Sequence, residues 1–424
     1  MKKLALFAAC LLALNVAAKV KLSVTTTAGE HRANIGDKIK FIISLADKKD
    51  AGKKINAEVI GNVDIAKKMV VTADKEGKAE VIVPALRPGF VYLRVQCADS
   101  NIRVCGVAVE PEKIQPGLPE PADFKAYWDN IKKKIDNTPM EIVMTPWETQ
   151  DKRVTGYRIK FPLGGKGKDA YGTLCFPKGA KRRSLPAMLR LYSAGSDWAV
   201  MEEKIAMSHG GIIVLALNPI PVENYTHRSK FVRKGGEFHG YSGWGITHRD
   251  TTFFNGMFQR LYRALNYLKS RPEWDGRILI VRGESQGGGQ ALAAAGLDPQ
   301  VTCCAAYVPG INNHGAIVKG GTPGWPHFYR RKAFAENPQA VLKATSYIDT
   351  VNFSRYSKAD TFVTVGFADL VAPAEGIYAA YNMLSGKKVI LTALTAGHTM
   401  PKHFAEEREK FIGEHIKKMK KLSK

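Results

Sequence analysis

The chain has 424 residues, which is too many for one ordinary domain and enough for two domains that each bury a core. Its 45% hydrophobic and 24% charged residues, without low-complexity tracts or repeats, exclude a disordered or fibrous protein. The formal net charge of +24 suits acidic partners, but the basic residues are spread along the chain and no nucleic-acid module is present, so we interpret the charge as a solvated surface without a nucleic-acid partner.

The first 18 residues predict a signal peptide. Two lysines begin it, residues 4–16 form an apolar run too short to span a bilayer, and Val16-Ala17-Ala18 resembles a cleavage site. We therefore expect export, to the periplasm or outside the cell. Cys10 offers lipoprotein anchoring as a weaker alternative, because it comes early in the apolar run. No later segment is long enough to span a membrane.

Residues 19–110 alternate polar and apolar side chains in short runs separated by turns, as in Ala79–Val83 and Val91–Val95. This period of two predicts the strands of an all-β sandwich, and we interpret it as an immunoglobulin-like accessory domain. Whether that domain binds carbohydrate or only shields its neighbour stays open. Cys97 and Cys105 flank a short turn and could form a disulfide in an oxidising compartment.

Five cysteines remain after removal of the signal peptide, so at least one thiol is free. Cys303 and Cys304 lie in an apolar stretch and are expected to be buried. No cysteine spacing indicates zinc or iron–sulfur binding, and we predict no metal.

Residues 111–123 form a proline-rich linker, and residues 124–424 then alternate strands with helices. This alternation predicts βαβ units and a mostly parallel sheet with helices on both faces. We expect strands at 187–191, 211–217, 278–281, 361–365 and 388–394, and helices at 124–135, 252–268, 286–295, 374–384 and 401–420.

The strongest functional signal is Gly283-Glu284-Ser285-Gln286-Gly287, between the β-rich run 277–281 and a small-residue helix. A nucleophile elbow needs glycine two residues before and after the serine, because a side chain there would collide with neighbouring strands. The start of the following helix also places backbone N–H groups near a developing oxyanion. This context favours Ser285 as the nucleophile of an α/β-hydrolase over a simple glycine-rich loop.

A serine nucleophile needs a histidine base, which in α/β-hydrolases follows the last strands. His398 fits, because it lies in the loop between the run 388–394 and the terminal helix; a surface histidine is the alternative. His403 and His415 fall within that helix, where surface or packing roles are expected.

The acid that orients the histidine should follow the preceding strand. Asp369 lies in the loop that leaves the strand 361–365, between the serine and the histidine in the chain, and a turn aspartate is the alternative. Asp360 lies at the wrong end of this strand. For the oxyanion hole we assign the backbone N–H groups of Gln286, after the nucleophile, and Tyr192, after the strand 186–191.

With these residues in place, the chain from about Pro119 to its end resembles the acetyl xylan esterase/cephalosporin-C deacetylase family, carbohydrate esterase family seven. The resemblance rests on Pro121–Trp128, Gly240–Gly245, Ser285–Gly289, Val308-Pro309, Asp369 with Pro373 and Tyr378–Asn382, and Gly397-His398. It implies an α/β-hydrolase in which Ser285 is the nucleophile, Asp369 the acid and His398 the base, with Tyr192 and Gln286 as oxyanion donors. It also implies acetylated carbohydrate as the substrate.

Three segments differ from that family. Arg190-Leu191-Tyr192 stands where the family has His-Gly-Tyr, Leu217–Pro221 replaces Arg-Gly-Gln, and Thr399 replaces a glutamate. The three catalytic residues are retained, but the pocket wall and the subunit contacts are affected. A homo-oligomer stays open, although the extra N-terminal domain could block the family's usual assembly.

The sequence therefore predicts a secreted serine esterase that removes acetyl groups from polysaccharide or oligosaccharide without a cofactor. The alternatives are an esterase for another acyl or uronate ester, a serine peptidase of prolyl-oligopeptidase type, and a non-catalytic glycan-binding protein. Against the peptidase, about 90 N-terminal residues are too few for a seven-bladed propeller.

Overall fold

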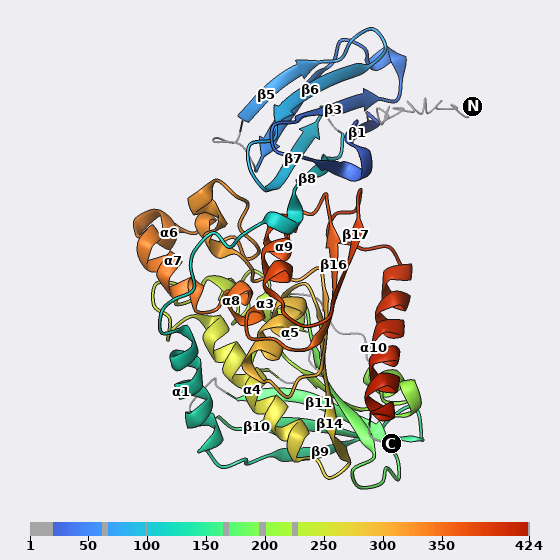
Figure 1. The fold of residues 1–424 in the computed structure, drawn as a ribbon, viewed down its shortest axis with the longest axis vertical. Coiled ribbons are helices and arrows are strands. Elements are labelled where there is room, and N and C mark those ends of the chain that lie inside the picture. The colour runs from blue at the N-terminus through green and yellow to red at the C-terminus, as the bar shows by residue number, and fades with distance from the viewer. Residues whose placement is uncertain are drawn as a thin grey trace, which may run out of the picture.

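The structure, a computed structural model, describes residues 20–61, 67–98, 100–163, 169–194, 201–222 and 228–422. The predicted signal peptide, residues 1–18, lies outside the described residues. An N-terminal all-β region is followed by a larger region in which helices cover both faces of a long, twisted sheet (Figure 1). The predicted fold class is confirmed.

Two sheets that face a shared core form the N-terminal region. One sheet has the order β1-β3-β6 and the other the order β2-β8-β7-β4-β5. The strands are β1 (Leu22–Thr26), β2 (Arg32–Ala33), β3 (Lys38–Leu45), β4 (Lys54–Ile60), β5 (Lys67–Thr72), β6 (Lys78–Pro84), β7 (Gly89–Gln96) and β8 (Arg103–Val109). Alternate side chains of β3, namely Ile39, Phe41 and Ile43, point into the core, as the period of two requires.

The disulfide considered for Cys97 and Cys105 is not formed, and both thiols are buried and free. The register of the antiparallel pair β7–β8 explains this, because Cys105 lies opposite Leu93 and not opposite Cys97. The Cys97 N–H instead donates to the Ser100 hydroxyl, at 2.9 Å, within the turn.

The proline-rich segment packs tightly against the larger region. It begins with a turn of 3-10 helix, η3 (Pro111–Lys113), and the Asn382 side chain donates to the carbonyls of Pro111 and Ile114, at 2.9 and 3.0 Å. The Gly117 N–H donates to the Asn313 side chain at 2.8 Å. These hydrogen bonds attach the segment to its neighbour along its length.

Within the described residues, the larger region has a nine-stranded sheet of order β17-β16-β15-β14-β12-β13-β11-β10-β9. The strands from β13 to β17 in this order are parallel, and β9, β10 and β11 extend the sheet as antiparallel strands. The strands are β9 (Val143–Trp147), β10 (Val154–Phe161), β11 (Ala170–Pro177), β12 (Leu185–Leu191), β13 (Ile213–Leu217), β14 (Trp274–Glu284), β15 (Cys303–Tyr307), β16 (Asp360–Gly366) and β17 (Lys388–Ala393).

Helices bury both faces of this sheet, which is why its central strands are continuously apolar. The side chains of α2 and α10 share one core cluster with the sheet, and those of α1, α4, α5, α8 and α9 share another on the opposite face. The helices are α1 (Phe124–Asp136), α2 (Glu202–Ala206), α3 (Arg228–Val232), α4 (Phe253–Ser270), α5 (Gln286–Leu297), α6 (Lys332–Glu336), α7 (Pro338–Ser346), α8 (Thr350–Ser354), α9 (Ala374–Met383) and α10 (His403–Lys421). All of the predicted strands and helices form close to their expected positions.

Candidate active site

Three parallel strands bring together the residues that the sequence singles out. Ser285 follows β14 directly, Asp369 follows β16, and His398 follows β17. Because the carboxyl ends of parallel strands lie at one edge of a sheet, the three side chains meet there although they come from distant parts of the chain.

Ser285 lies in the sharp strand–turn–helix unit that the glycine spacing predicts. Its backbone has φ 56° and ψ −120°, a conformation that non-glycine residues rarely adopt. A Cβ atom on Gly283 would lie 2.2 Å from the Gly287 carbonyl oxygen, and one on Gly287 would lie 2.2 Å from that of Leu191. Both glycines are therefore required by close backbone approach.

The surrounding backbone holds this strained turn in place. The Ser285 N–H donates to the Tyr307 carbonyl at 2.8 Å, and the Ser285 carbonyl accepts from the N–H groups of Gly289 and Gly310, at 3.1 and 2.9 Å. With its backbone fixed on both sides, the serine can present its hydroxyl in one direction.

The hydroxyl of Ser285 is hydrogen-bonded to Nε2 of His398 at 2.9 Å, and Nδ1 of His398 to Oδ2 of Asp369 at 2.7 Å. Asp369 is fully buried. Its other carboxylate oxygen accepts the N–H groups of Val371 and Ala372, at 2.8 and 2.9 Å. The carboxylate is therefore held in a fixed orientation by its own loop and by the imidazole.

Two opposing effects set the proton affinity of His398. Partial burial disfavours its charged form, but the hydrogen bond and charge of Asp369, with the charge of Glu284, outweigh burial and raise the pKa of His398 above 6.5. A base of raised pKa that is hydrogen-bonded to a hydroxyl can take the proton as that hydroxyl attacks an electrophile.

The two expected oxyanion donors belong to segments that lie next to each other. Gln286 begins α5, Tyr192 follows β12, and a Cβ atom on Gly287 would lie 3.0 Å from the Tyr192 carbonyl carbon. The Tyr192 carbonyl accepts from the Gln290 side chain at 3.3 Å. The start of α5, which follows Ser285 directly, and the end of β12 are thus in contact.

Arg190, which stands where the family has histidine, contacts both Tyr192 and Glu202. The Arg190 guanidinium lies 4.7 Å from the centre of the Tyr192 ring and forms an ion pair with the buried Glu202, which also accepts the Tyr192 hydroxyl at 2.6 Å. Sequence reasoning missed this cluster, because Glu202 belongs to no recognised motif.

Aromatic side chains that sequence reasoning did not assign contact residues adjoining the turn at Ser285. The Tyr241 hydroxyl donates to the Gln286 side chain. Trp325 packs 3.3 Å from where a Cβ of Gly310 would be, and its ring meets that of Phe254 edge to face. Tyr241 falls in a segment that supports the family resemblance, but Trp325 lies in a long loop without periodicity and gives no signal.

A second hydroxyl–histidine–carboxylate series lies at the opposite edge of the sheet. His415, predicted to be a packing or surface residue, is buried and joins Thr302 Oγ1 to Asp360 Oδ2, each at 3.0 Å. Asp360 also pairs with Lys418 at 3.2 Å. The predicted placement of Asp360 at the wrong end of its strand is confirmed. His403 begins α10.

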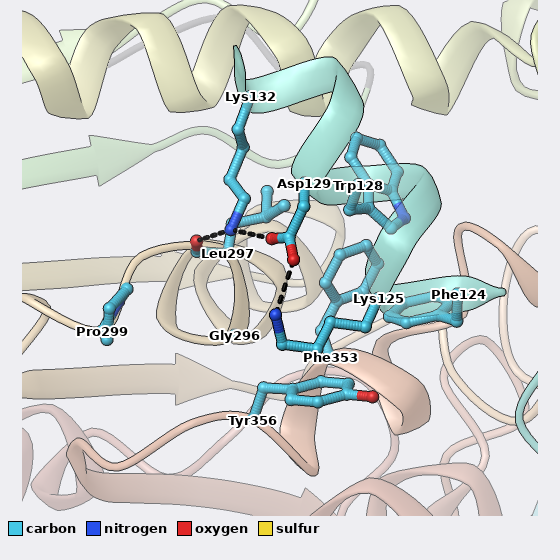
Figure 2. A pocket seen from close by; sticks show the side chains of 10 residues that line it. All are labelled: Phe124, Lys125, Trp128, Asp129, Lys132, Gly296, Leu297, Pro299, Phe353 and Tyr356. Atoms are coloured by element: carbon cyan, nitrogen blue, oxygen red, sulfur yellow. Dashed lines mark hydrogen bonds and ion pairs between the residues drawn. The ribbon is translucent and has the colours of Figure 1, made fainter. Parts of the chain in front are cut away.

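A cavity of about 180 Å³ shown in Figure 2 lies away from these residues. Gly296 and Leu297, at the C-terminal end of α5, line it, whereas Ser285 precedes the N-terminal end of the same helix. A 12-residue helix is ~18 Å long, so the two sites are separate. The Asp129 carboxylate at the cavity is paired with Lys125 and Lys132, at 2.5 and 2.8 Å.

No group of three or more His, Cys, Asp or Glu side chains among the described residues is arranged to hold a metal ion. Within the same residues, every helix is too short or too polar to cross a membrane.

The chain is similar in sequence to known acetyl esterases. The sequence model of a protein family described as acetyl xylan esterase (AXE1) matches residues 110–415. Acetyl esterase Axe7A of Xylanibacter ruminicola is 28% identical over 333 residues, which cover 74% of this chain and 72% of that protein.

Solved structures show the same fold. An acetyl xylan esterase from Paenibacillus sp. R4 superposes with a TM-score of 0.63 at 25% identity, and acetyl xylan esterase 1 from Thermoanaerobacterium sp. JW/SL YS485 with 0.63 at 23%. Each superposition covers 72% of this chain and 98% of the solved chain.

Proposed function

The chain belongs to the acetyl xylan esterase family and hydrolyses esters, and we propose that it is an exported serine esterase that removes acetyl groups from acetylated polysaccharide or oligosaccharide. The observation that carries the proposal is the hydrogen-bonded series from Ser285 through His398 to the buried Asp369, built on a strained turn.

In the first half of the reaction, Ser285 Oγ attacks the carbonyl carbon of the acetyl ester while Nε2 of His398 takes its proton. The backbone N–H groups of Gln286 and Tyr192 stabilise the negative oxygen of the tetrahedral intermediate. The C–O bond to the sugar then breaks, and the sugar alcohol leaves with the proton from His398. Asp369 keeps the imidazole oriented and stabilises its charged form.

In the second half, His398 takes a proton from water, whose oxygen attacks the acetyl-serine carbon. The bond to Ser285 breaks as the serine regains its proton from His398, and acetate is released. Both halves use only groups of this chain and water.

The family to which the chain belongs supports acetyl as the acyl group. Trp325 lies close to Gly310, whose N–H binds the Ser285 carbonyl. The signal peptide predicted at residues 1–18 supports export of the protein.

The test is release of acetate by purified protein from acetylated xylo-oligosaccharides, with a methyl glucuronate ester and an aminoacyl amide as competing substrate classes. We expect acetate release that Ser285→Ala abolishes. Preference for the uronate ester would replace the proposed substrate, and turnover of the amide alone would favour a peptidase. Glycan binding without turnover of any substrate would reject an enzyme altogether.

A further inference from the structure

The loop that carries Asp369 lies against the N-terminal β region. This loop, Phe367–Pro373, which we name the acid loop, connects β16 to α9. In Figure 1 the strands β7 and β8 lie beside α9 and the adjoining end of the sheet. Residues of β7 and β8, including Phe90 and Tyr92, belong to the same hydrophobic cluster as Phe367 and Tyr378, so the two regions share a core there.

The first end of the acid loop rests on the backbone of β8. A Cβ atom on Gly106 would lie 1.7 Å from the Phe367 carbonyl oxygen, so only glycine allows this approach. The rings of Phe90 and Phe367 pack edge to face with centres 5.0 Å apart. Phe367 lies two residues before Asp369, so its contacts with Gly106 and Phe90 hold the backbone just before the carboxylate.

The second end of the acid loop is fixed by Tyr92. The N–H of Ala374, which begins α9, donates to the Tyr92 hydroxyl at 3.0 Å. The first N–H groups of a helix have no acceptor within it, and Tyr92 supplies one from the other region. Tyr92 is fully buried, so water cannot replace its hydroxyl without rearrangement.

An ion pair strengthens the same junction. Arg87 pairs with Glu375 at 3.1 Å, and Glu375 is 3% exposed. The other oxygen of Glu375 accepts the Thr322 N–H at 3.1 Å. Glu375 therefore connects the N-terminal region, the start of α9 and the loop around Thr322.

We propose that the N-terminal β region positions the catalytic acid, with Tyr92 as the main positioning residue and Gly106 and the Arg87–Glu375 pair in support. The inference rests on the proposed function, because Asp369 is the catalytic acid only if Ser285 and His398 hydrolyse esters. It goes beyond the proposed function, because the part of the chain that matches the family begins at residue 110, after β8, and the family match therefore assigns no role to the β region. The β region is then part of the catalytic framework and not only an appended module.

The pKa of His398 reports whether Asp369 stays in place. The carboxylates that raise the pKa of His398 are Asp369 and Glu284, and burial together with Glu375 and Asp369 raises the pKa of Tyr92, whose hydroxyl stays neutral. If the acid loop shifts, Asp369 moves from His398 and the pKa of His398 falls. A variant that only unfolds part of the protein lowers activity without moving that pKa.

The decisive variant is Tyr92→Phe, tested in the full chain with acetylated xylo-oligosaccharide after titration of the active serine. We expect kcat to fall about 10-fold with KM within about twofold, and the acid limb of the kcat/KM profile to move to lower pH. In the Asp369→Asn background, Tyr92→Phe should have no further effect, because the group it positions is already lost.

Two control variants test whether the effect depends on the place of Tyr92 in the fold. Tyr262→Phe removes a tyrosine hydroxyl bound to Asp136, at 3.2 Å, and Ile43→Val trims the β-region core away from the junction; both should keep the wild-type kcat. Gly106→Ala should lower kcat more than Tyr92→Phe, with the same shift of the acid limb, because its Cβ would collide with the Phe367 carbonyl and displace the loop itself, whereas Tyr92→Phe removes one hydrogen bond.

The inference is overturned if Tyr92→Phe keeps the wild-type kcat and acid limb. An equal loss in the wild-type and Asp369→Asn backgrounds would also overturn it, since the two residues would then act independently. If the wild-type protein shows no ester hydrolysis that depends on Ser285, the proposed function itself is wrong. That result differs from the two outcomes above, in which the wild-type protein is active.

Discussion

β16 has a hydroxyl–histidine–carboxylate series near each of its ends. At its carboxyl end, Asp369, His398 and Ser285 are connected by hydrogen bonds of 2.7 and 2.9 Å. At its amino end, Asp360, His415 and Thr302 are connected by two bonds of 3.0 Å. The chemical groups and distances are nearly the same, so distances alone do not identify the active site.

The surroundings of the two series differ. The Thr302 hydroxyl also donates to the Leu279 carbonyl at 3.2 Å and lies in ordinary backbone, whereas Ser285 lies on a strained turn beside the start of a helix. Burial lowers the pKa of His415, against the attraction of Asp360, while Asp369 raises that of His398. The His415 side chain is 4% exposed and that of His398 28%. A catalytic series needs access, a poised base and nearby oxyanion donors.

The largest contrast is expected from removing the two hydroxyls. Ser285→Ala should lower kcat by about 10⁴-fold or more, because no other group can form the acyl intermediate. Thr302→Val should keep kcat within about twofold. The measurement is steady-state release of acetate, with circular dichroism to establish folding; comparable losses in both variants would remove the distinction between the two edges.

The carboxylates provide the next contrast. Asp369→Asn should lower kcat by ~10³-fold or more, because the amide neither orients the neutral imidazole correctly nor stabilises its charged form. Asp360→Asn should lower kcat by less than about threefold and act mainly on thermal stability. Parallel kinetics and melting curves for the two variants check this, and a large kcat loss in Asp360→Asn would contradict it.

The pH dependence distinguishes the two histidines without substitution. His398 must be neutral to accept the serine proton, so kcat/KM should fall as the pH drops through its raised pKa, above 6.5. His415, whose pKa is lowered, would titrate below 6.5. A pH–rate profile of the wild-type protein gives the answer, and an acid limb centred below pH 6.5 would assign control to another group.

The smallest effect on turnover is expected for His415→Gln. Loss of its two hydrogen bonds should lower the free energy of unfolding by about 1–3 kcal/mol, because the partners stay buried around it. Turnover at 25 °C should be unchanged. Denaturant titration and kcat on the same preparation test this, whereas His398→Gln should show the reverse pattern.

The features that the sequence predicts are those that depend on nearby residues. The elbow at Ser285 requires glycines within two positions, and His398 and Asp369 follow apolar strands in a fixed order. Periodicity did not predict the strand β15, because Cys303–Tyr307 is short and rich in small residues. It also did not predict β9, β10 and β11, which pair antiparallel at one end of the sheet.

The contacts that the sequence does not predict join distant residues. Tyr92 reaches the N–H of Ala374 from another region of the chain, and no period or motif links the two positions. The ion pair of Arg190 with Glu202 likewise joins β12 to α2, and no motif links these two elements. Burial and register, which tertiary packing decides, determine both contacts.

The buried thiols give each region its own chemical reporter of opening. Cys105 lies in the β region and Cys304 in the sheet of the larger region, and burial raises the pKa of Cys105 to about 12 and that of Cys304 further. Alkylating reagents attack the thiolate, so both side chains are protected while their surroundings stay closed. Mass spectrometry of timed alkylation can therefore show whether the two regions open together, as their shared core requires, or one before the other.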